Sequence, residues 1–428
     1  MKHGCVFGAA AWVFAGILVA PAEGYEPPAA LDGLVRIALG RNRELLAARQ
    51  QIAEQRGLLR QAGMRSSPGV EVGYGTGRPL GTAGEQLFSA GLSYQIETSG
   101  KRSRRVDAAR KSVDLAEAEV ARQAWDLVST IKIQYYEAVA NRMKAETLER
   151  LIEINRESLR LVQARVEHGD AAPLDRDLLL VEMSRAEAQL ADFRGREQSA
   201  LIELRSLASL RADEGLAVAE PNIRAPGPLP ELQRLALEQR SDLRTARVRE
   251  DLGRAELSLA EAQARPDVNL SAGYTRETAR FDQFGVNAAG ARVQLLDTDN
   301  ILSVGVSIPL LTRRKNAGNI EAAEARRAGA RLRREHLEAT IPIEVEAAYL
   351  RWTAAHRMRE IIERGVIELS EKNLEIIRQA HVLGQLRTLD VLNEQRRLVE
   401  TRLAYADSIA GMWRALVDLE RAVGGSLQ

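Results

Sequence analysis

The feature that most constrains this fold is a long segment without helix-breaking residues. From Lys101 to His168 the sequence contains neither glycine nor proline. Its apolar residues recur in steps of three and four, which predicts an amphipathic helix: Ala109, Val113, Ala116, Val120, Ala124, Leu127, Ile131, Tyr135 and Ala138. At about 1.5 Å per residue, a continuous helix over this range would be roughly 100 Å long. Because this length far exceeds that of a globular helix, it must pack laterally on long neighbours.

A tight turn and a second long helix follow. The segment Gly169-Asp170-Ala171-Ala172-Pro173 turns the chain, with Gly169 expected as the helix C-cap, and a helix returns from Leu174 to about Arg211. Residues 214–230 contain four prolines and are expected to form a linker at the equator of the molecule, between two halves.

The second half of the chain repeats the first. Ala236-Leu237 corresponds to Ala38-Leu39 at a spacing of 198, and Gly384 corresponds to Gly169 at a spacing of 215. Each repeat is therefore expected to run helix, strand, strand, long helix, turn, long helix. Pro342 has no counterpart and is expected to bend or split the second long helix. The predicted ranges are 23–213 for the first repeat (strands about 68–75 and 87–96, helical hairpin about 101–211) and 231–428 for the second (strands about 267–275 and 301–310, hairpin about 313–424), with a long loop from Arg276 to Asn300.

Four short segments alternate between apolar and small or polar residues. In residues 302–310, leucine, valine and isoleucine occupy one face, and serine, glycine and proline the other. In an exported protein this alternation predicts a membrane β-barrel, with two soluble hairpins packed on helices as the alternative. A sheet in lipid has to close, and four strands cannot close alone. Two chains would give eight strands with a filled interior, whereas three would give twelve strands and an open lumen.

The N-terminal segment indicates export. Lys2 and His3 precede an apolar run, and Ala20-Pro21-Ala22 fits a signal-peptidase site, so residues 1–22 are expected to be a signal peptide, with an uncleaved anchor as the alternative. The single cysteine, Cys5, lies inside this segment, so no disulfide is expected in the mature chain. Charges of both signs are interspersed at a formal net charge of +1, which argues against a nucleic-acid-binding surface.

These features resemble the TolC-type outer-membrane efflux protein family over essentially the whole mature chain. The resemblance rests on the duplicated layout, on Arg165-x-x-x-Gly169, and on Val382-Leu383-Gly384-x-x-x-Thr388-Leu389-Asp390-Val391-Leu392. The segment Gln95-x-Glu97-x-x-Gly100-Lys101-Arg102-x-x-Arg105 is similar to the heavy-metal branch, which comprises cobalt–zinc–cadmium and copper–silver types. The family implies a mainly α-helical homotrimer with a twelve-stranded β-barrel in the outer membrane, continued by a twelve-helix α-barrel in the periplasm.

The resemblance also implies a function and partners. The trimer would be a passive duct that exports substrates, heavy-metal cations among them, and it would dock with a periplasmic membrane-fusion adaptor and an inner-membrane pump of the resistance-nodulation-division class. The competing hypothesis is a periplasmic or surface coiled-coil scaffold without a pore. No enzyme, cofactor or metal site is expected. Gln95 to Lys101 lacks the first glycine of a phosphate loop, and the four histidines outside the signal segment are not at metal-ligand spacing.

Two groups of residues are expected to matter at the far end of the helices. By resemblance, Asp390 lies just inside the periplasmic tip, where the family places acidic rings that narrow the closed entrance, and Arg387 is expected to form a charge pair there. Asn393 stands where a second acid is common in the family, so this sequence departs from the double-ring pattern. The alternative role for Asp390, and for Asp175, is to cap the helix that follows its turn. The adaptor is expected to dock on His168, Gly169, Leu174, Asp175, Leu383, Gly384, Thr388 and Leu389.

Overall fold

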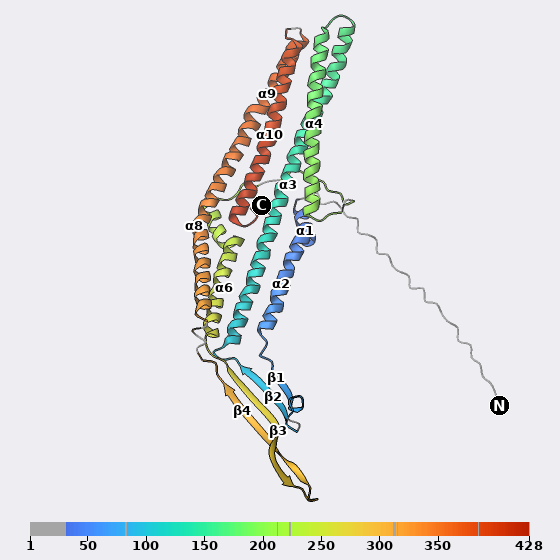
Figure 1. Ribbon diagram of the computed structural model, residues 1–428. Helices are drawn as coiled ribbons and strands as arrows, with labels where there is room; N and C mark the ends of the chain where they lie inside the picture. Colours follow the sequence, from blue (N-terminus) through green and yellow to red (C-terminus); the bar gives the residue numbers. More distant parts are fainter. Residues whose placement is uncertain are drawn as a thin grey trace, which may run out of the picture.

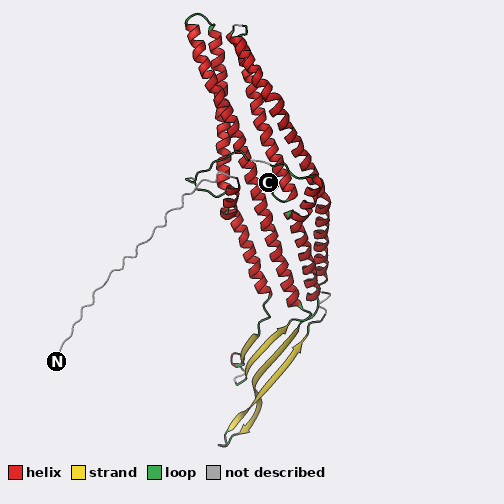
Figure 2. Ribbon diagram, turned by 180° about the vertical axis from the view of Figure 1, so that it is seen from behind, coloured by secondary structure: helices red, strands yellow, loops and turns green. Residues whose placement is uncertain are grey.

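The computed structural model describes residues 31–81, 84–211, 213–221, 224–310, 314, 316–383 and 385–427. The expected signal peptide lies outside these ranges. Helices form one elongated body, and all four strands project together from one of its ends (Figures 1 and 2). The elements are α1 (Leu31–Arg41), α2 (Arg43–Ala62), β1 (Gly69–Thr76), η1 (Arg78–Leu80), β2 (Gln86–Ile96), α3 (Lys101–Glu167), α4 (Pro173–Leu207), α5 (Leu229–Gln239), α6 (Ser241–Gln263), β3 (Val268–Val286), β4 (Arg292–Ser307), α8 (Ala317–Ile361), η2 (Ile362–Ile367), α9 (Glu368–Val382) and α10 (Thr388–Val423).

The central helix, α3, is continuous over 67 residues, as the absence of glycine and proline predicts. Gly100 begins it with a φ of 68°, in the left-handed region that only glycine adopts readily. Gly169 follows the C-cap residue His168 with a φ of 82° and begins the turn between α3 and α4. Pro173 then supplies the first residue of α4, where its missing N–H costs nothing because that donor has no helical acceptor.

The long helices lie side by side in a single row. In the half nearer the sheet the order is α2, α3, α6, α8, and in the far half it is α4, α3, α10, α9 (Figure 1). No further long helix covers the outer sides of α2, α8 and α9 among the described elements, while α4 contacts both α3 and, near the tip, α10. The helical body is therefore an open layer rather than a closed bundle.

The best-buried core lies at the middle of the helical body. There Tyr136 of α3 packs against Trp413 of α10 with ring centroids 5.2 Å apart. Lys132 of α3 and Glu420 of α10 form an ion pair of 2.6 Å whose side chains are only 7% and 2% exposed. The Pro-rich linker crosses this level, where the hydroxyl of Tyr135 donates to the carbonyl of Ala219 at 3.0 Å.

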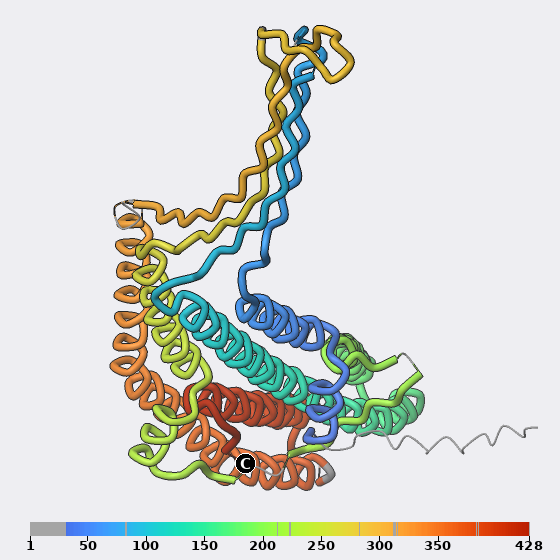
Figure 3. The backbone as a smooth tube through the Cα atoms, turned by 90° about the horizontal axis from the view of Figure 1, so that it is seen from below, coloured from blue at the N-terminus to red at the C-terminus, as the bar shows by residue number. Residues whose placement is uncertain are grey.

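The four strands form one antiparallel sheet in the order β1-β2-β3-β4, which leaves the helices as a twisted ribbon (Figure 3). Cross-strand partners such as Val72 and Ala90, or Ala272 and Val304, place most of the apolar residues near the helices on one face of all four strands. Glycine and serine are partners on the other face, for example Gly73 with Ser89. The alternation seen in each segment is thus in phase across the whole sheet.

Two expectations about the second repeat, a long loop from 276 to 300 and a split at Pro342, are wrong, whereas a bend at Pro342 stays a prediction. Most of the segment expected as a loop is strand, since β3 continues to Val286 and β4 begins at Arg292. Pairing continues because each strand satisfies the backbone groups of the other, for example at Thr278 and Thr298. Pro342 does not split its helix: α8 continues through it to Ile361, and a π-helical segment, η2, follows instead. Packing of the fully buried Ile341 holds the helix together across the missing hydrogen bond.

Candidate functional site

The apolar face of the sheet is exposed in a single chain. Val70 is 76% exposed, and Leu302 and Val304 are each 80% exposed. A contiguous set of large apolar side chains at this exposure requires an apolar environment or a partner. The sheet also has two open edges, β1 and β4, whose outer backbone groups have no strand beside them among the described residues.

The opposite face of the sheet consists of small residues in tight contact. A Cβ atom on Gly73 would lie 2.6 Å from Oγ of Ser89, and one on Gly305 would lie 2.7 Å from Oγ of Ser271. A side chain at either glycine position would force the facing serine hydroxyl to move. The part of this face nearest the helices is therefore small and polar, whereas Leu87 and Ile301 lie on the same face farther along the strands.

A carboxylate that the sequence analysis did not single out ties the sheet to the helices. Asp267 lies just before β3 and accepts a hydrogen bond from the Thr98 N–H at 3.0 Å and one from Nε2 of Gln95 at 2.9 Å. Its Oδ1 also pairs with Nζ of Lys101 at 2.8 Å, and both side chains are largely buried. Burial raises the pKa of Asp267, but the hydrogen bonds from Lys101, Thr98 and Gln95 outweigh it and hold the pKa below its ordinary value.

The segment that resembles the heavy-metal branch is the other part of this junction. Arg105 donates to both carboxylate oxygens of Glu97, at 2.6 and 3.2 Å. Arg102 donates to the Gly63 carbonyl at the end of α2, at 2.6 Å. Together with the ion pair between Lys101 and Asp267, these contacts join α2, β2, α3 and β3 at one level of the molecule. Residues 95–105 together with Asp267 are called the junction below.

The two helical turns lie together at the end of the body opposite the sheet (Figure 1). We call residues 168–175 and 383–390 the tip. Three leucines of the tip, Leu174, Leu383 and Leu389, are 65%, 72% and 45% exposed. Nδ1 of His168 lies 2.7 Å from the Ala164 carbonyl, so this histidine bonds to its own helix end. Gly384 lies outside the described residues.

Asp390 is an exposed residue in the first turn of α10. Its Oδ2 accepts the backbone N–H of Arg387 at 3.0 Å, and its own N–H donates to the Arg387 carbonyl at 3.0 Å. This is the reciprocal half of a capping box and favours the helix-cap role. Asn393 is exposed one turn further along, and Thr388 begins the helix. Asp175 lies in the first turn of α4, without a side-chain bond to its cap position.

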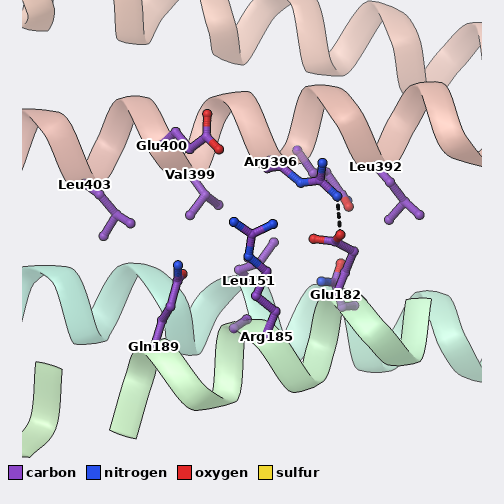
Figure 4. Close-up of a pocket in the computed structure, with 12 residues that line it drawn as sticks. Leu151, Glu182, Arg185, Gln189, Leu392, Arg396, Val399, Glu400 and Leu403 are labelled. Carbon is purple, nitrogen blue, oxygen red and sulfur yellow. Dashed lines mark hydrogen bonds and ion pairs between the residues drawn. The ribbon is translucent and has the colours of Figure 1, made fainter. Parts of the chain in front are cut away.

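The two hairpins meet through both polar and apolar contacts between the tip and the middle of the body, with Val399 of α10 packed on Leu148 and Ala186. Figure 4 shows Glu182 of α4 directed toward Arg396 of α10, with which it forms an ion pair. Beside this pair, a cavity of about 60 Å³ is lined by residues of α3, α4 and α10. Asn155 faces it and is 2% exposed, with no described hydrogen-bond partner for Oδ1. A buried polar atom without a described partner, such as Oδ1 of Asn155, weakens this contact between the hairpins.

Sequence reasoning missed Glu182, Arg396 and Asp267. The first two lie 214 positions apart. That spacing is close to the repeat offset of 215 at the turns, so the sequence repeat alone indicates that Glu182 and Arg396 lie at a similar distance from the tip. Among the described residues, no three histidine, cysteine, aspartate or glutamate side chains are grouped as metal ligands would be. None of the described helices combines the length and the apolar character needed to cross a membrane.

Residues 34–209 and 232–425 match the family described as Outer membrane efflux protein. The chain belongs to this family. This efflux protein therefore transports substrates out through the outer membrane. A large helical part of the protein lies in the periplasm. The family description concerns efflux and names no catalytic activity.

Individual relatives agree with this assignment. The efflux protein is 24% identical over 401 residues to the cobalt-zinc-cadmium resistance protein CzcC of Cupriavidus metallidurans, covering 93% of this chain and 90% of that one. It is 28% identical over 353 residues to the outer membrane protein OprJ of Pseudomonas aeruginosa, covering 79% and 70%. Its fold is similar to that of CusC, with a TM-score of 0.75 at 19% identity over 92% of both chains.

Proposed function

We propose that three copies of this efflux protein form a passive duct through the outer membrane. The observation that carries the proposal is the sheet, with its exposed apolar face, its face of small polar residues and its two open edges. Edge strands in lipid have to pair with another chain. Three copies supply twelve strands, whose small inner residues would surround a water-filled lumen. The open rows of four helices would close in the same way into a twelve-helix tube.

Mass measurement in detergent and current recording test this proposal together. The expected result is a trimer that conducts ions across a planar bilayer. A stable monomer with intact β-structure would refute it and favour the scaffold alternative. A trimer without conductance would refute the duct but not the assembly.

The tip would bind the periplasmic adaptor, which links the duct to an inner-membrane pump of the resistance-nodulation-division class. Support comes from the exposed leucines of the tip and from its distance from the sheet. Gly169 has a φ of 82° and open space around its Cβ position, so a substitution there changes backbone preference without a clash. Gly169→Val should abolish pump-dependent resistance at normal trimer levels, while Gly169→Asn should preserve it because asparagine tolerates this conformation. Resistance in both variants would show that docking does not depend on this turn.

The gate would involve Asp390, with Arg387 and Asn393 beside it. Three copies of Asp390 around a trimer axis would repel one another, and divalent cations would relieve that repulsion. Asp390→Asn removes the charge but keeps an acceptor for the Arg387 N–H, whereas Asp390→Ala removes both. Weaker divalent-cation block of the current in both variants indicates a gate. Unchanged block, with only the alanine variant less stable by about 1 kcal/mol, indicates a helix cap alone.

Heavy-metal cations are the proposed cargo. Support comes from the similarity to a protein named for cobalt-zinc-cadmium resistance and from the junction segment typical of that branch. Expression with a metal pump and adaptor in a strain that lacks its own channel should restore growth on zinc, cobalt or cadmium. Restoration of drug resistance alone, with a drug pump, would overturn the metal assignment and leave the duct intact.

A further inference from the structure

The β3–β4 hairpin extends beyond the other two strands. The first residue of β2, Gln86, is the partner of Thr278, so β3 residues beyond this level pair with β4 alone. This two-stranded ribbon ends at the turn between Val286 and Arg292. It forms the end of the molecule farthest from the tip (Figure 1).

In this hairpin the strand register places the described arginines and the described carboxylates on opposite faces of the sheet. Arg276 and Arg280 lie an even number of residues from Tyr274, on the face that carries the exposed apolar side chains. Arg292 lies an even number of residues before Leu302, on the same face. The acids Glu277, Asp297 and Asp299 occupy the opposite face, with Glu277 directly across from Asp299. Among the described side chains of residues 276–300, every arginine lies on the apolar face and every carboxylate on the other.

The depth of two of these arginines matches the boundary of a membrane. With about 3.4 Å per residue and a tilt of about 40°, Arg276 and Arg280 lie roughly 20 and 30 Å above Val268. The apolar band of an outer-membrane barrel is about 25 Å tall. Arg276 pairs in register with Phe88, at the aromatic level expected for the edge of that band. Both arginines are exposed and extend from an apolar surface toward the layer of lipid headgroups.

We propose that Arg276 and Arg280 bind the phosphate groups of lipids in the outer leaflet. The proposal rests on the proposed barrel, which directs the apolar face toward lipid. Guanidinium groups form bidentate, charge-assisted hydrogen bonds with phosphate. Among the described side chains, Glu277, Asp297 and Asp299 face the lumen instead, so these carboxylates do not repel anionic headgroups. The arginine–phosphate contacts and the apolar face of the strands together set the depth of the barrel in the membrane.

Native mass spectrometry of the trimer tests the proposal. The probes are phosphatidic acid and diacylglycerol with the same acyl chains, which differ only in the phosphate. The wild-type trimer should retain phosphatidic acid in preference to diacylglycerol. Arg276→Gln with Arg280→Gln should lower that retention by about 30-fold. The control, Arg150→Gln with Arg160→Gln on exposed positions of α3, should retain as much as the wild type.

The outcomes separate this proposal from the one on which it rests. Equal retention by the wild type and the Arg276/Arg280 variant, in a conducting trimer, overturns the lipid surface and leaves the duct intact. Displacement of the lipid by millimolar inorganic phosphate shows a general anion site and also overturns it. Absence of any trimer or conductance in the wild type refutes the barrel, and the lipid surface with it.

Discussion

Replacing Asp267 with asparagine tests whether the junction holds the sheet to the helices. Lys101, Gln95 and the Thr98 N–H converge on this carboxylate at 2.8, 2.9 and 3.0 Å. The side chains of Lys101 and Asp267 are only 10% and 15% exposed. Asparagine has nearly the same shape, but it removes the charge and replaces one accepting oxygen with an NH2 group, which cannot accept from Gln95. It leaves the ammonium of Lys101 buried without its counter-charge.

The expected cost follows from this burial. Neutralising one partner of a buried ion pair costs about 3–5 kcal/mol, and the residual exposure of both groups places the junction at about 3 kcal/mol. Since about 1.4 kcal/mol is a factor of ten, local opening of the junction should become roughly 150-fold more frequent.

Hydrogen–deuterium exchange of the trimer in detergent measures this opening. Amides in residues 95–105 and 262–270 should exchange roughly 150-fold faster in Asp267→Asn, while those around Tyr135 at the equator should not change. Adding Lys101→Met should recover part of the loss, because no unpaired ammonium then remains. Exchange at the junction within threefold of the wild type would refute the reasoning. Simple additivity of the two changes would refute the coupling between Asp267 and Lys101.

The pKa of Asp267 predicts the pH dependence. It is lower in the folded protein than its ordinary value, which is about 3.9 in an unfolded chain. The stabilising contribution is therefore complete above about pH 4 and is lost as the pH falls through the folded pKa. After correction for intrinsic exchange, protection of the junction amides in the wild type should fall as the pH drops below about 4. Asp267→Asn should not show this pH-dependent loss of protection. Identical pH profiles would contradict the assignment.

Three further variants test other parts of the molecule. Glu182→Gln removes an ion pair between the hairpins that is worth about 1 kcal/mol to the closed tip, so the open probability of the channel in planar bilayers should rise about fivefold. Glu149→Gln loses an ion pair within one hairpin and should leave the open probability unchanged. Equal currents in the wild type and both variants would show that the Glu182–Arg396 pair does not hold the tip closed. In Gly73→Val, the new Cβ would lie 2.6 Å from Oγ of Ser89, so the yield of membrane-inserted trimer should fall. Adding Ser89→Ala should partly restore that yield. An undiminished yield in Gly73→Val would count against tight packing on this face of the sheet. Glu420→Gln leaves a buried lysine without its counter-charge at a cost of about 3–5 kcal/mol, so the Tm measured by circular dichroism should drop, and an unchanged Tm would show that the equatorial pair contributes little.

Some features of the fold could be predicted because they are local. The continuous α3 follows from the absence of glycine and proline between Lys101 and His168, although α3 is buried on more sides than the one predicted apolar stripe. The two faces of the sheet follow from alternation in each strand, since successive side chains point to opposite sides. The repeat offsets indicated that both halves use the same order of elements.

Other features escaped the sequence because the partners are far apart in the chain. Nothing near Asp267 indicates that Lys101 lies beside it, and nothing near Glu182 indicates Arg396. The extent of β3 and β4 was underestimated because charged and polar residues of an extended hairpin have the composition of a loop. The sequence left Asp390 open between gate and cap, and the structure adds the hydrogen bond that favours a cap.

The sequence by itself determined the type of each long element and which side of each strand is apolar. These properties depend on the spacing of residues within one segment, so a single chain read in order contains them. Only the tertiary structure decided which side chains meet at the junction, how far the β3–β4 hairpin extends, and that its arginines and carboxylates lie on opposite faces. Those properties depend on the register between segments, and register is set by pairing and packing over distances in sequence that no local pattern spans.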